Sequence, residues 1–465
     1  MGRRGRHPRL KSIRMEKLAA EGKSLAHVEG AVLFVPGTVP GDVVEVQVNR
    51  RKGTAWEGYV TAWEELSALR VQPPCRHFDH CGGCQWQMLP YELQLEAKEE
   101  QVREQLRRLG GVELPELDPI LGADPTLYYR NKLEFTFSPR GWITEAGQEE
   151  AGFPMALGFH VPRRFDRVLD IEECLLEPDP ANALRNAARD FAIAQGYSFY
   201  DPKVQQGWLR NLMVRVTTTG EVMALLVMAY DDPPRRDELL GHIAGQFPGI
   251  TSLLYCINPK VNDTIYDLEV HTHSGRAYIE EQLADLRFSI GPKSFYQTNS
   301  RQAERLYARV LEMVQLAPTD LVYDLYTGTG TIALYVARHA ARVVGVETVP
   351  EAVEDAWLNA QRNGLENVEF HAGDVLRMLN EDFVQRHGRP DVLITDPPRV
   401  GMHPGVIDTL LRLRPKRIVY VSCNPATQAR DLRLLDEAYR VERVQPVDMF
   451  PHTKHVENIV SLVLR

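Results

Sequence analysis

The chain has few cysteines, no long apolar run and no excess of positive charge. Six cysteines among 465 residues are too few for a disulfide-stapled scaffold and fit a reducing compartment, so we expect a cytoplasmic protein. The longest apolar run, residues 222–229, is far shorter than the roughly 18 residues of a membrane span, and no secretory signal is evident, so we expect no membrane partner. A net charge of −9 excludes a uniformly basic nucleic-acid coat but allows local basic patches.

The remaining composition is that of a globular protein. A hydrophobic fraction of 44% and a charged fraction of 25% exclude a disordered or fibrous chain, and the length suggests roughly three domains at about 150 residues each. The amino-terminal segment is basic, and we interpret it as a solvated tail, with RNA phosphate binding as the alternative. Its basic residues are Arg3, Arg4, Arg6, Arg9, Lys11 and Arg14.

Short β-rich runs alternate with turns over residues 11–70, which predicts a small all-β barrel. The expected strands include Ala31–Val35, Val43–Val48 and Trp56–Ala62. The turn after the second strand is expected to carry three basic residues, Arg50, Arg51 and Lys52. At the barrel rim these side chains either hold an oligonucleotide or are simply solvated.

An amphipathic pattern over Tyr91–Gly110 predicts a helix that ends at Gly110 and Gly111. From Leu127 to Phe288 the chain mixes strand-like runs with one helix near Ala181–Ala194, which predicts an α+β region. Its expected strands are Lys132–Ser138, Leu212–Thr217, Val222–Ala229 and Ser252–Asn258. At its start, residues 128–132 interleave aromatic and basic side chains. This pattern fits a surface on which bases stack, or, as the alternative, core aromatic residues flanked by exposed charges.

From Ala317 onward strands alternate with helices, which predicts a doubly wound α/β domain. The expected elements are Leu321–Tyr326, Thr331–His339, Val343–Glu347, Ala352–Gly364, Val368–His371, Val392–Thr395 and Arg417–Ser422. Ligands of such domains bind at the carboxyl ends of the strands. The residues that follow these strands are therefore the candidates for chemistry.

The first strand of this domain runs into a glycine-rich turn, Asp324-Leu-Tyr-Thr-Gly-Thr-Gly-Thr-Ile-Ala333. Gly328 and Gly330 allow a ligand to approach the backbone closely at a helix amino terminus. Glu347 ends the next strand about twenty residues on, where it can accept ribose hydroxyls. The pattern predicts an adenosine-type cofactor, but it does not separate a nicotinamide cofactor from S-adenosylmethionine.

A second motif, Asp396-Pro-Pro-Arg, follows the strand Val392–Thr395. Two consecutive prolines stiffen the turn, so we expect Asp396 to face the cofactor at a fixed angle. Because a hydride-transfer enzyme has no obvious use for such a carboxylate, the motif favours S-adenosylmethionine. The alternative is an ordinary Asp-Pro-Pro turn.

Two further residues are candidates for covalent and acid–base chemistry. Cys423 ends a buried-looking strand in Tyr420-Val-Ser-Cys-Asn-Pro, where a nucleophile would face a pocket, although a lone cysteine in a strand is more often a core residue. Glu457, in His455-Val-Glu-Asn, supplies a carboxylate that is either a base or a surface glutamate.

Together these motifs resemble the RNA uridine-5 methyltransferases, which make 5-methyluridine in ribosomal and transfer RNA. The resemblance follows the chain in order: a barrel like the family's TRAM domain, a cysteine cluster, Ser294-Phe-Tyr-Gln-Thr-Asn299, the glycine-rich turn, Asp-Pro-Pro-Arg, Ser-Cys-Asn-Pro-Ala-Thr and the terminal His-Val-Glu. It implies a Rossmann-like S-adenosylmethionine-dependent methyltransferase domain with an amino-terminal β-barrel and an α+β central domain.

The resemblance also implies roles that agree with the chemistry. C5 of uracil is a poor nucleophile, so Cys423 would add to C6, C5 would attack the sulfonium methyl, and Glu457 would remove the C5 proton. Asp396 and Gln297 would lie between cofactor and base, and Phe295 would stack on a flipped base. The implied cofactor site comprises Gln297, Tyr326, Gly328, Gly330, Thr331, Glu347, Asp374 and Asp396. Thr331 departs from the asparagine frequent in the family.

Four cysteines fit one metal centre: Cys75, Cys81, Cys84 and Cys174. Four thiolates can hold zinc or an iron–sulfur cluster, and their spacing alone leaves zinc a serious competitor. The resemblance points to a [4Fe-4S] cluster with a structural and RNA-positioning role. The remaining cysteine, Cys256, lies in an apolar strand and is interpreted as core.

We therefore expect a barrel over residues 10–70, a central domain over 71–90 and 119–288, and a catalytic domain over 91–118 and 289–465, so that the helix Tyr91–Gly110 packs on the last. The combination of barrel and four cysteines is similar to the branch that acts on 23S ribosomal RNA, with transfer RNA as the alternative substrate. We expect a monomer.

Two rival functions remain open at this point. An RNA 5-methylcytosine methyltransferase usually carries a second cysteine beside the proline of its Asp-Pro-Pro-like motif, and Asp396-Pro-Pro has none. A non-catalytic RNA-binding module would use the barrel and the cysteine cluster with an inactive cofactor pocket.

Overall fold

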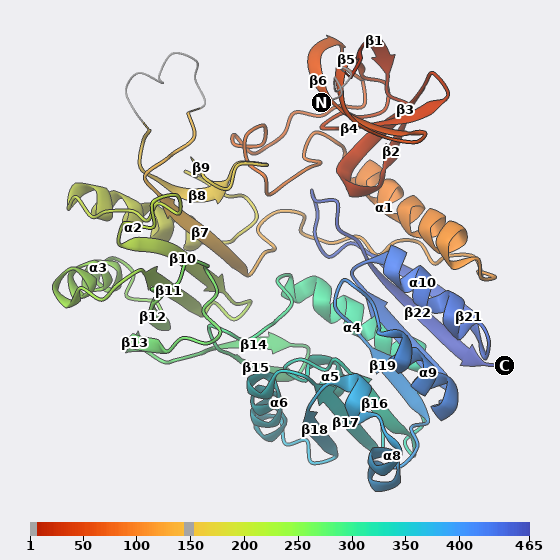
Figure 1. Cartoon of the computed structure of the whole chain (residues 1–465). Helices are drawn as coiled ribbons and strands as arrows, with labels where there is room; N and C mark the ends of the chain where they lie inside the picture. The colour runs from red at the N-terminus through yellow and green to blue at the C-terminus, as the bar shows by residue number, and fades with distance from the viewer. Residues whose placement is uncertain (1–6, 144–152) are drawn as a thin grey trace, which may run out of the picture.

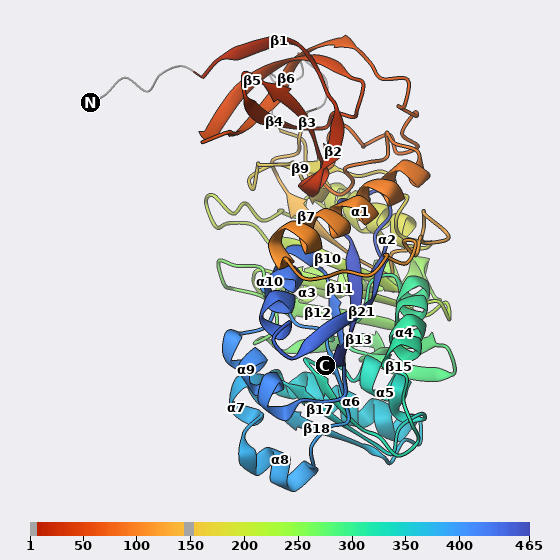
Figure 2. The same ribbon diagram turned by 90° about the vertical axis from the view of Figure 1, so that its right-hand side faces the viewer.

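A computed structural model describes residues 7–143 and 153–465. Three parts are visible in Figures 1 and 2: an amino-terminal barrel, a central sheet with two helices, and a larger α/β part that contains the carboxyl terminus. Arg3, Arg4 and Arg6 of the basic amino-terminal segment lie outside the described residues. Among the helices that are described, none has the length and apolar character needed to cross a membrane.

The amino-terminal strands form a six-stranded sheet in the order β1-β5-β6-β4-β3-β2. Their bounds are β1 Arg9–Arg14, β2 Lys17–Ala19, β3 Lys23–Val28, β4 Ala31–Pro36, β5 Val43–Lys52 and β6 Ala55–Glu65. The two edge strands are joined by Met15 and Glu16 alone, so the sheet must curl until its edges meet. Alternate residues such as Leu33, Val35 and Val46 are buried inside it. The predicted barrel is confirmed.

The basic residues predicted for a turn of the barrel lie in a strand instead. Arg50, Arg51 and Lys52 extend β5 and pair with β6, and the turn follows at Gly53. The Arg51 guanidinium stacks 3.7 Å from the centre of the Trp56 ring, which favours the extended conformation.

The predicted amphipathic helix is α1, Tyr91–Gln105, and it continues through a π-helical turn to Gly110. Gly111 ends it with a φ of +62°, as expected for a glycine cap. Of its apolar positions Val102 and Leu106 are fully buried, as an amphipathic helix requires, but Leu109 is 51% exposed. The polar residues Gln94 and Lys98 are buried as well, which the amphipathic pattern did not predict. The helix packs against the α/β part, as predicted (Figure 1).

The central part is a seven-stranded sheet in the order β13-β12-β11-β10-β7-β8-β9. Its elements are β7 Lys132–Ser138, β8 Ala156–His160, β9 Val168–Asp170, α2 Ala181–Ala194, β10 Leu209–Val216, β11 Val222–Met228, α3 Pro233–Gln246, β12 Ser252–Ile257 and β13 Val270–Gly275. The expectation of a single helix is wrong, because Asp232 caps a second one, α3, that starts with two prolines. Both helices pack on one face of the sheet. Cys256 is fully buried, as predicted.

A hairpin, β14 Ile279–Leu283 and β15 Leu286–Ile290, leads into the α/β part. The helices there are α4 Ser300–Val314, α5 Thr331–Ala337, α6 Pro350–Arg362, α7 Val375–Met378, α8 Glu381–His387, α9 Pro404–Leu413 and α10 Pro425–Leu435. The strands are β16 Leu321–Leu325, β17 Arg342–Glu347, β18 Val368–Ala372, β19 Val392–Thr395, β20 Arg417–Ser422, β21 Tyr439–Val447 and β22 Glu457–Leu464.

This last sheet has the order β18-β17-β16-β19-β20-β22-β21, with β22 antiparallel to both of its neighbours. Alternate residues of its strands enter two different cores: Val322 packs with α4 and α5, and Tyr323 with the helices of the opposite face. The predicted doubly wound domain is confirmed. Its strand order reverses between β16 and β19, so ligands are expected at the carboxyl ends of those two strands.

Candidate active site

The glycine-rich turn joins the carboxyl end of β16 to α5, at the point where the strand order reverses. Gly328 and Gly330 adopt φ values of 57° and 81°, and a Cβ on Gly330 would lie 3.1 Å from the Phe370 ring. The Glu347 carboxylate, at the end of β17, accepts a hydrogen bond of 3.0 Å from the Gly328 N–H. The acid predicted to bind ribose therefore lies against the turn predicted to hold the cofactor.

Two other predicted cofactor residues, Tyr326 and Asp374, lie near Glu347. Tyr326 has a φ of +63° at the end of β16. Burial, followed by the negative charges of Asp374, Asp431 and Glu347, raises the pKa of Tyr326 to about 12. The structure thus places Glu347, at the end of β17, and Asp374, just after β18, near the Tyr326 phenol.

Asp396 lies directly after β19, in the turn that Pro397 and Pro398 stiffen. Its N–H donates a hydrogen bond of 3.3 Å to the Leu325 carbonyl, which ties this turn to the end of β16. Burial, reinforced by the charge of Asp324, raises the pKa of the Asp396 carboxyl to about 7. The motif is therefore a buried acid at the strand-order reversal rather than an ordinary surface turn.

Cys423 and Glu457 meet Asp396 at this edge of the sheet. Burial, with the charges of Glu457 and Asp396, raises the pKa of the Cys423 thiol to about 11. Burial and the charge of Asp396 raise the pKa of Glu457 to about 8. Glu457 is only 6% exposed, so the alternative of a surface glutamate is wrong. Three separate strand ends thus bring a thiol and two carboxyls together.

Arg399 is a site residue for which the sequence analysis assigned no role. Its guanidinium lies beside the Cys423 sulfur and close to Glu457, and its positive charge lowers the pKa of both groups against the effect of burial. Its backbone carbonyl accepts hydrogen bonds from the Asn424 amide and the Thr427 hydroxyl, at 3.0 and 3.1 Å. Arg399 is the fourth residue of the Asp-Pro-Pro-Arg motif, and this position was the sequence signal that could have pointed to a role in the site.

The segment containing Phe295 and Gln297 lies beside the glycine-rich turn, because the Thr329 hydroxyl donates a hydrogen bond of 3.3 Å to the Phe295 carbonyl. Phe295 is 68% exposed. The Gln297 carbonyl accepts a hydrogen bond of 2.9 Å from the Asn131 amide, which ties the segment to the central part. The Thr331 hydroxyl lies 3.2 Å from that of Tyr307, so this residue of the turn contacts α4.

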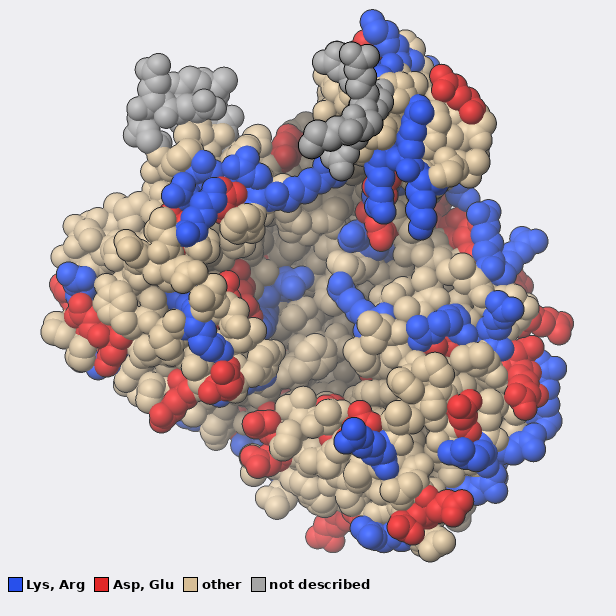
Figure 3. Space-filling model, in the orientation of Figure 1, with Lys and Arg blue, Asp and Glu red and all other residues tan. Residues whose placement is uncertain are grey.

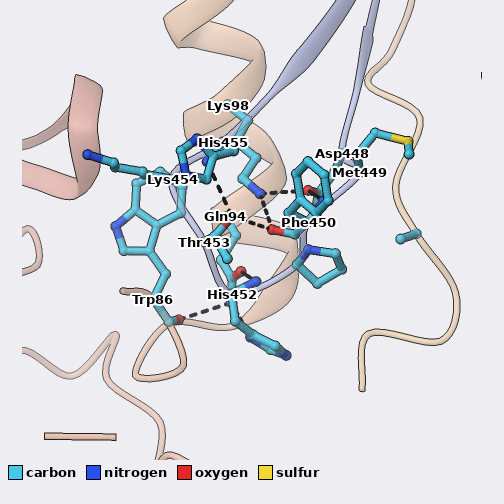
Figure 4. A network of polar contacts seen from close by, with 12 residues as sticks. Trp86, Gln94, Lys98, Asp448, Met449, Phe450, His452, Thr453, Lys454 and His455 are labelled. Atoms are coloured by element: carbon cyan, nitrogen blue, oxygen red, sulfur yellow. Dashed lines mark hydrogen bonds and ion pairs between the residues drawn. The ribbon is translucent and has the colours of Figure 1, made fainter. Parts of the chain in front are cut away.

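The segment between β21 and β22, which leads directly into Glu457, is anchored by α1 (Figure 4). The Lys98 ammonium donates to the Asp448 carboxylate at 2.6 Å and to the Phe450 carbonyl at 3.1 Å, and both charged side chains are completely buried. The Gln94 side chain accepts a hydrogen bond of 2.9 Å from the His452 N–H. This explains why the polar residues Gln94 and Lys98 of α1 are buried.

The four cysteines predicted to share a metal gather around one cavity of about 230 Å³. Cys75, Cys81 and Cys84 come from the segment before α1, and Cys174 comes from the loop after β9. Burial raises the pKa of the Cys84 and Cys174 thiols to about 12. The cavity abuts the segment before β22, because the Gln85 and Trp86 N–H groups both donate to the His452 carbonyl.

Residues 128–132 are interpreted either as a base-stacking surface or as core aromatics flanked by charges, and different residues of the segment fit each interpretation. Tyr129 is buried and donates a hydrogen bond of 3.1 Å to the Pro451 carbonyl, as a core residue would. Tyr128 is 47% exposed. Arg130 lines the cysteine cavity and also the cavity that contains Phe295.

Comparison with known proteins agrees with this site. Residues 273–465 match the family model described as tRNA (uracil-5-)-methyltransferase. A protein of Bacteroides thetaiotaomicron named an uncharacterized RNA methyltransferase is 54% identical over 96% of this chain and 100% of its own length. Another of that name, from Chlorobaculum tepidum, is 40% identical over 93% of this chain and 91% of its own.

One solved structure is similar over almost the entire chain. The crystal structure of the Pyrococcus abyssi tRNA (uracil-54, C5)-methyltransferase in complex with S-adenosyl-L-homocysteine has a TM-score of 0.76 and 29% sequence identity. The match covers 98% of this chain and 100% of that one. The chain belongs to the uracil-5 RNA methyltransferase family and is an S-adenosylmethionine-dependent RNA (uracil-5-)-methyltransferase.

Proposed function

We propose that the enzyme methylates uridine through a covalent adduct between Cys423 and C6 of uracil, with Glu457 as the base that removes the C5 proton. One observation carries the proposal: Cys423, Glu457 and Asp396 meet at the buried edge of the sheet where its strand order reverses. Addition of a thiolate to C6 creates the enolate that makes C5 nucleophilic. A thiol with two carboxyls beside it matches that requirement.

Each step has a residue to perform it. S-adenosylmethionine supplies the electrophilic sulfonium methyl when it is bound at the glycine-rich turn. Arg399 stabilises the Cys423 thiolate that adds to C6, while Asp396 and Gln297 orient the uracil edge. After the methyl has reached C5, Glu457 takes the C5 proton and Cys423 leaves C6. A base with a pKa of about 8 suits proton removal near neutral pH.

The target base must leave its stack to reach this buried edge. Phe295 is the residue proposed to stack on the flipped base, because it is 68% exposed and its backbone is hydrogen-bonded to Thr329 of the glycine-rich turn. The cofactor would be held by Tyr326, Glu347 and Asp374 around that turn.

The proposed substrate is 23S ribosomal RNA, on which a cytoplasmic monomer would act. The combination of an amino-terminal barrel with four gathered cysteines supports this branch. Transfer RNA is the second candidate, and the specific observation in its favour is the likeness to a solved tRNA methyltransferase. Methylation of each RNA with labelled S-adenosylmethionine decides between them, because the preferred substrate is methylated at a higher kcat/KM.

The cysteine cavity is proposed to hold a [4Fe-4S] cluster, which would supply a rigid cross-link between the segment before α1 and the central part. Four thiols from two separate segments line this cavity, and four thiolates can hold either a [4Fe-4S] cluster or a tetrahedral zinc ion. Zinc is therefore the alternative occupant. Stoichiometric zinc in anaerobically purified protein, without visible absorbance, would contradict the cluster proposal.

The nucleophile is tested with Cys423→Ala, and Cys256→Ala is a matched control because Cys256 is buried away from the site. We expect the first variant to lose uridine methylation and the second to keep it. Unchanged methylation by Cys423→Ala would overturn the assignment. Formation of 5-methylcytosine instead of 5-methyluridine would show an RNA cytosine methyltransferase.

A further inference from the structure

Two cavities border strand β7, and we refer to them together as the groove. The cavity beside Phe295 and Tyr296, next to the active site, measures about 340 Å³. The far cavity, of about 810 Å³, lies under the loop that follows β8. Phe159 lines both of them, so they adjoin at this side chain, which also borders the separate cysteine cavity.

Strand β7 forms the floor of this groove. Lys132 and Glu134 line the cavity near the active site, and Thr136 and Ser138 line the far cavity. At about 3.3 Å per residue, the distance from Lys132 to Ser138 is about 20 Å. Several nucleotides span that length, since a stacked strand rises about 3.4 Å per nucleotide.

The charges of the two cavities suit a polyanion. Their accessible cations are Arg130, Lys132, Arg163 and Arg164, and their carboxylates are Glu134, Asp166 and Asp263. Two further lining arginines, Arg210 and Arg215, are buried. Each carboxylate is already paired, with Lys132, Arg164 and Arg210 respectively, so among the described residues Arg130 and Arg163 are the cations left for a polyanion. This local excess of cations opposes the composition of the chain, which has 63 acidic and 54 basic residues. Figure 3 shows the face shared by the three parts, hollowed between them, with Lys and Arg along its upper rim.

The loop over the far cavity presents an exposed aromatic ring beside an exposed arginine. Phe165 lines the cavity and is 70% exposed. Arg163, two residues before it, is exposed and forms no ion pair with any residue in the described ranges. An aromatic face with an adjacent cation is the combination that binds single-stranded nucleic acid, because the base stacks and the phosphate is neutralised.

We propose that this groove holds the single-stranded RNA that flanks the target uridine, with a base stacked on Phe165 and a phosphate on Arg163. This subsite rests on the proposed function, since the strand must enter the active site at Phe295. It lies several nucleotides from the methylated base. It therefore selects substrates by the presence of an unpaired flank, independently of the chemistry at Cys423.

The test measures binding of the full chain to two labelled oligouridines, one of roughly 12 nucleotides and one of roughly 3. Phe165→Ala should weaken binding of the long oligomer about tenfold, and Arg163→Ala should weaken it several-fold and lower its salt dependence by about one ion. Neither variant should change binding of the short oligomer. Tyr230→Ala and Arg433→Ala are matched controls, because these residues are exposed outside the groove.

The outcomes separate the subsite from the function. If wild type and both variants bind the long oligomer equally, the groove proposal is wrong and its arginines serve another partner, such as an acidic protein. If wild type methylates no RNA, the proposed function fails whatever the groove does. Unchanged affinity for S-adenosylmethionine in each variant shows that the fold is intact.

Discussion

Two groups of buried charges flank the same short segment, and they differ in how their charges are compensated. On one side Asp448 accepts hydrogen bonds from Lys98, from the Tyr91 hydroxyl at 2.8 Å and from the Phe450 N–H at 3.0 Å. On the other side Glu457 shares its pocket with the Asp396 carboxyl, the charge of Arg399 offsets its burial only in part, and among the described residues its side chain accepts no hydrogen bond. Fully compensated charge holds the segment in place, and incompletely compensated charge leaves a group ready to exchange a proton.

The difference shows why both groups are needed close together. A base with a raised pKa must be buried, and burial is tolerated only when the surrounding backbone does not relax toward water. The Lys98 and Gln94 anchors fix the segment that ends at Glu457. The paired group therefore holds in place the backbone that keeps Glu457 buried.

The largest expected effect is on turnover. Glu457→Gln keeps the shape of the side chain but removes the base, so we expect product formation to fall about 10²- to 10⁴-fold. Because Cys423 can still add and C5 can still be methylated, RNA should remain covalently attached to the protein and be visible on a denaturing gel. The double variant with Cys423→Ala should show no attached RNA, and attached RNA in it would contradict the mechanism.

The second effect is on stability. Lys98→Met leaves Asp448 buried without its cation, which should cost about 3–5 kcal/mol and lower Tm on the order of 10 °C. Lys17→Met is the control, because its ion pair with Glu100 is exposed and should contribute at most about 1 kcal/mol. Adding Asp448→Asn to Lys98→Met should recover part of the loss. Equal Tm changes for the two single variants would remove the distinction between the two groups.

A smaller effect concerns the pH dependence of stability. The carboxyl of Glu457 titrates near 4.5 in the unfolded chain and at a pKa of about 8 when folded. Between these values the unfolded chain releases a proton that the folded protein keeps, so stability falls as pH rises. The Glu457→Gln variant has no carboxyl at this position, so its stability does not fall with pH for this reason. Its Tm should exceed that of wild type by several degrees at pH 8 and match it near pH 4.5, as differential scanning calorimetry can measure.

The smallest effect is a shift in the pH profile of the reaction. Methylation should rise with pH as the carboxyl pair and the Cys423 thiol lose protons. Arg399→Met removes the charge that lowers the pKa of both Cys423 and Glu457, so the rise in kcat/KM should move to higher pH by about one unit or less. An unshifted pH profile would show that the charge of Arg399 does not affect the pKa of Cys423 or Glu457 in the working enzyme.

Local patterns predicted the α/β part well. The strand β19 has the predicted bounds, Val392–Thr395, and β20 has the predicted bounds, Arg417–Ser422, because short apolar runs end there at polar or proline residues. Helix α3 was missed because Pro233 and Pro234 resemble a turn, yet prolines are tolerated in the first turn of a helix. The hairpin of β14 and β15 was also missed: Leu286-Arg-Phe-Ser-Ile290 alternates apolar and polar residues, but β14 carries the polar Glu281 at the centre of its buried face.

The burial of polar residues in α1 was beyond local patterns. Gln94 and Lys98 are hydrophilic by any scale, and only their partners His452 and Asp448, some 350 residues away, make their burial favourable. Arg399 was missed for the same reason, since its effect depends on the distance to Cys423 and Glu457.

The sequence by itself determined which chemical groups follow the strands. A glycine-rich turn, a rigid acid and a cysteine each come directly after a strand. It determined this because the carboxyl ends of parallel strands share one edge. Only the tertiary structure decided that Glu457, which begins an antiparallel strand, also reaches that edge, and that four cysteines up to 99 positions apart share one cavity. Burial and proximity are properties of the packed chain, and they turn these residues from candidates into a site.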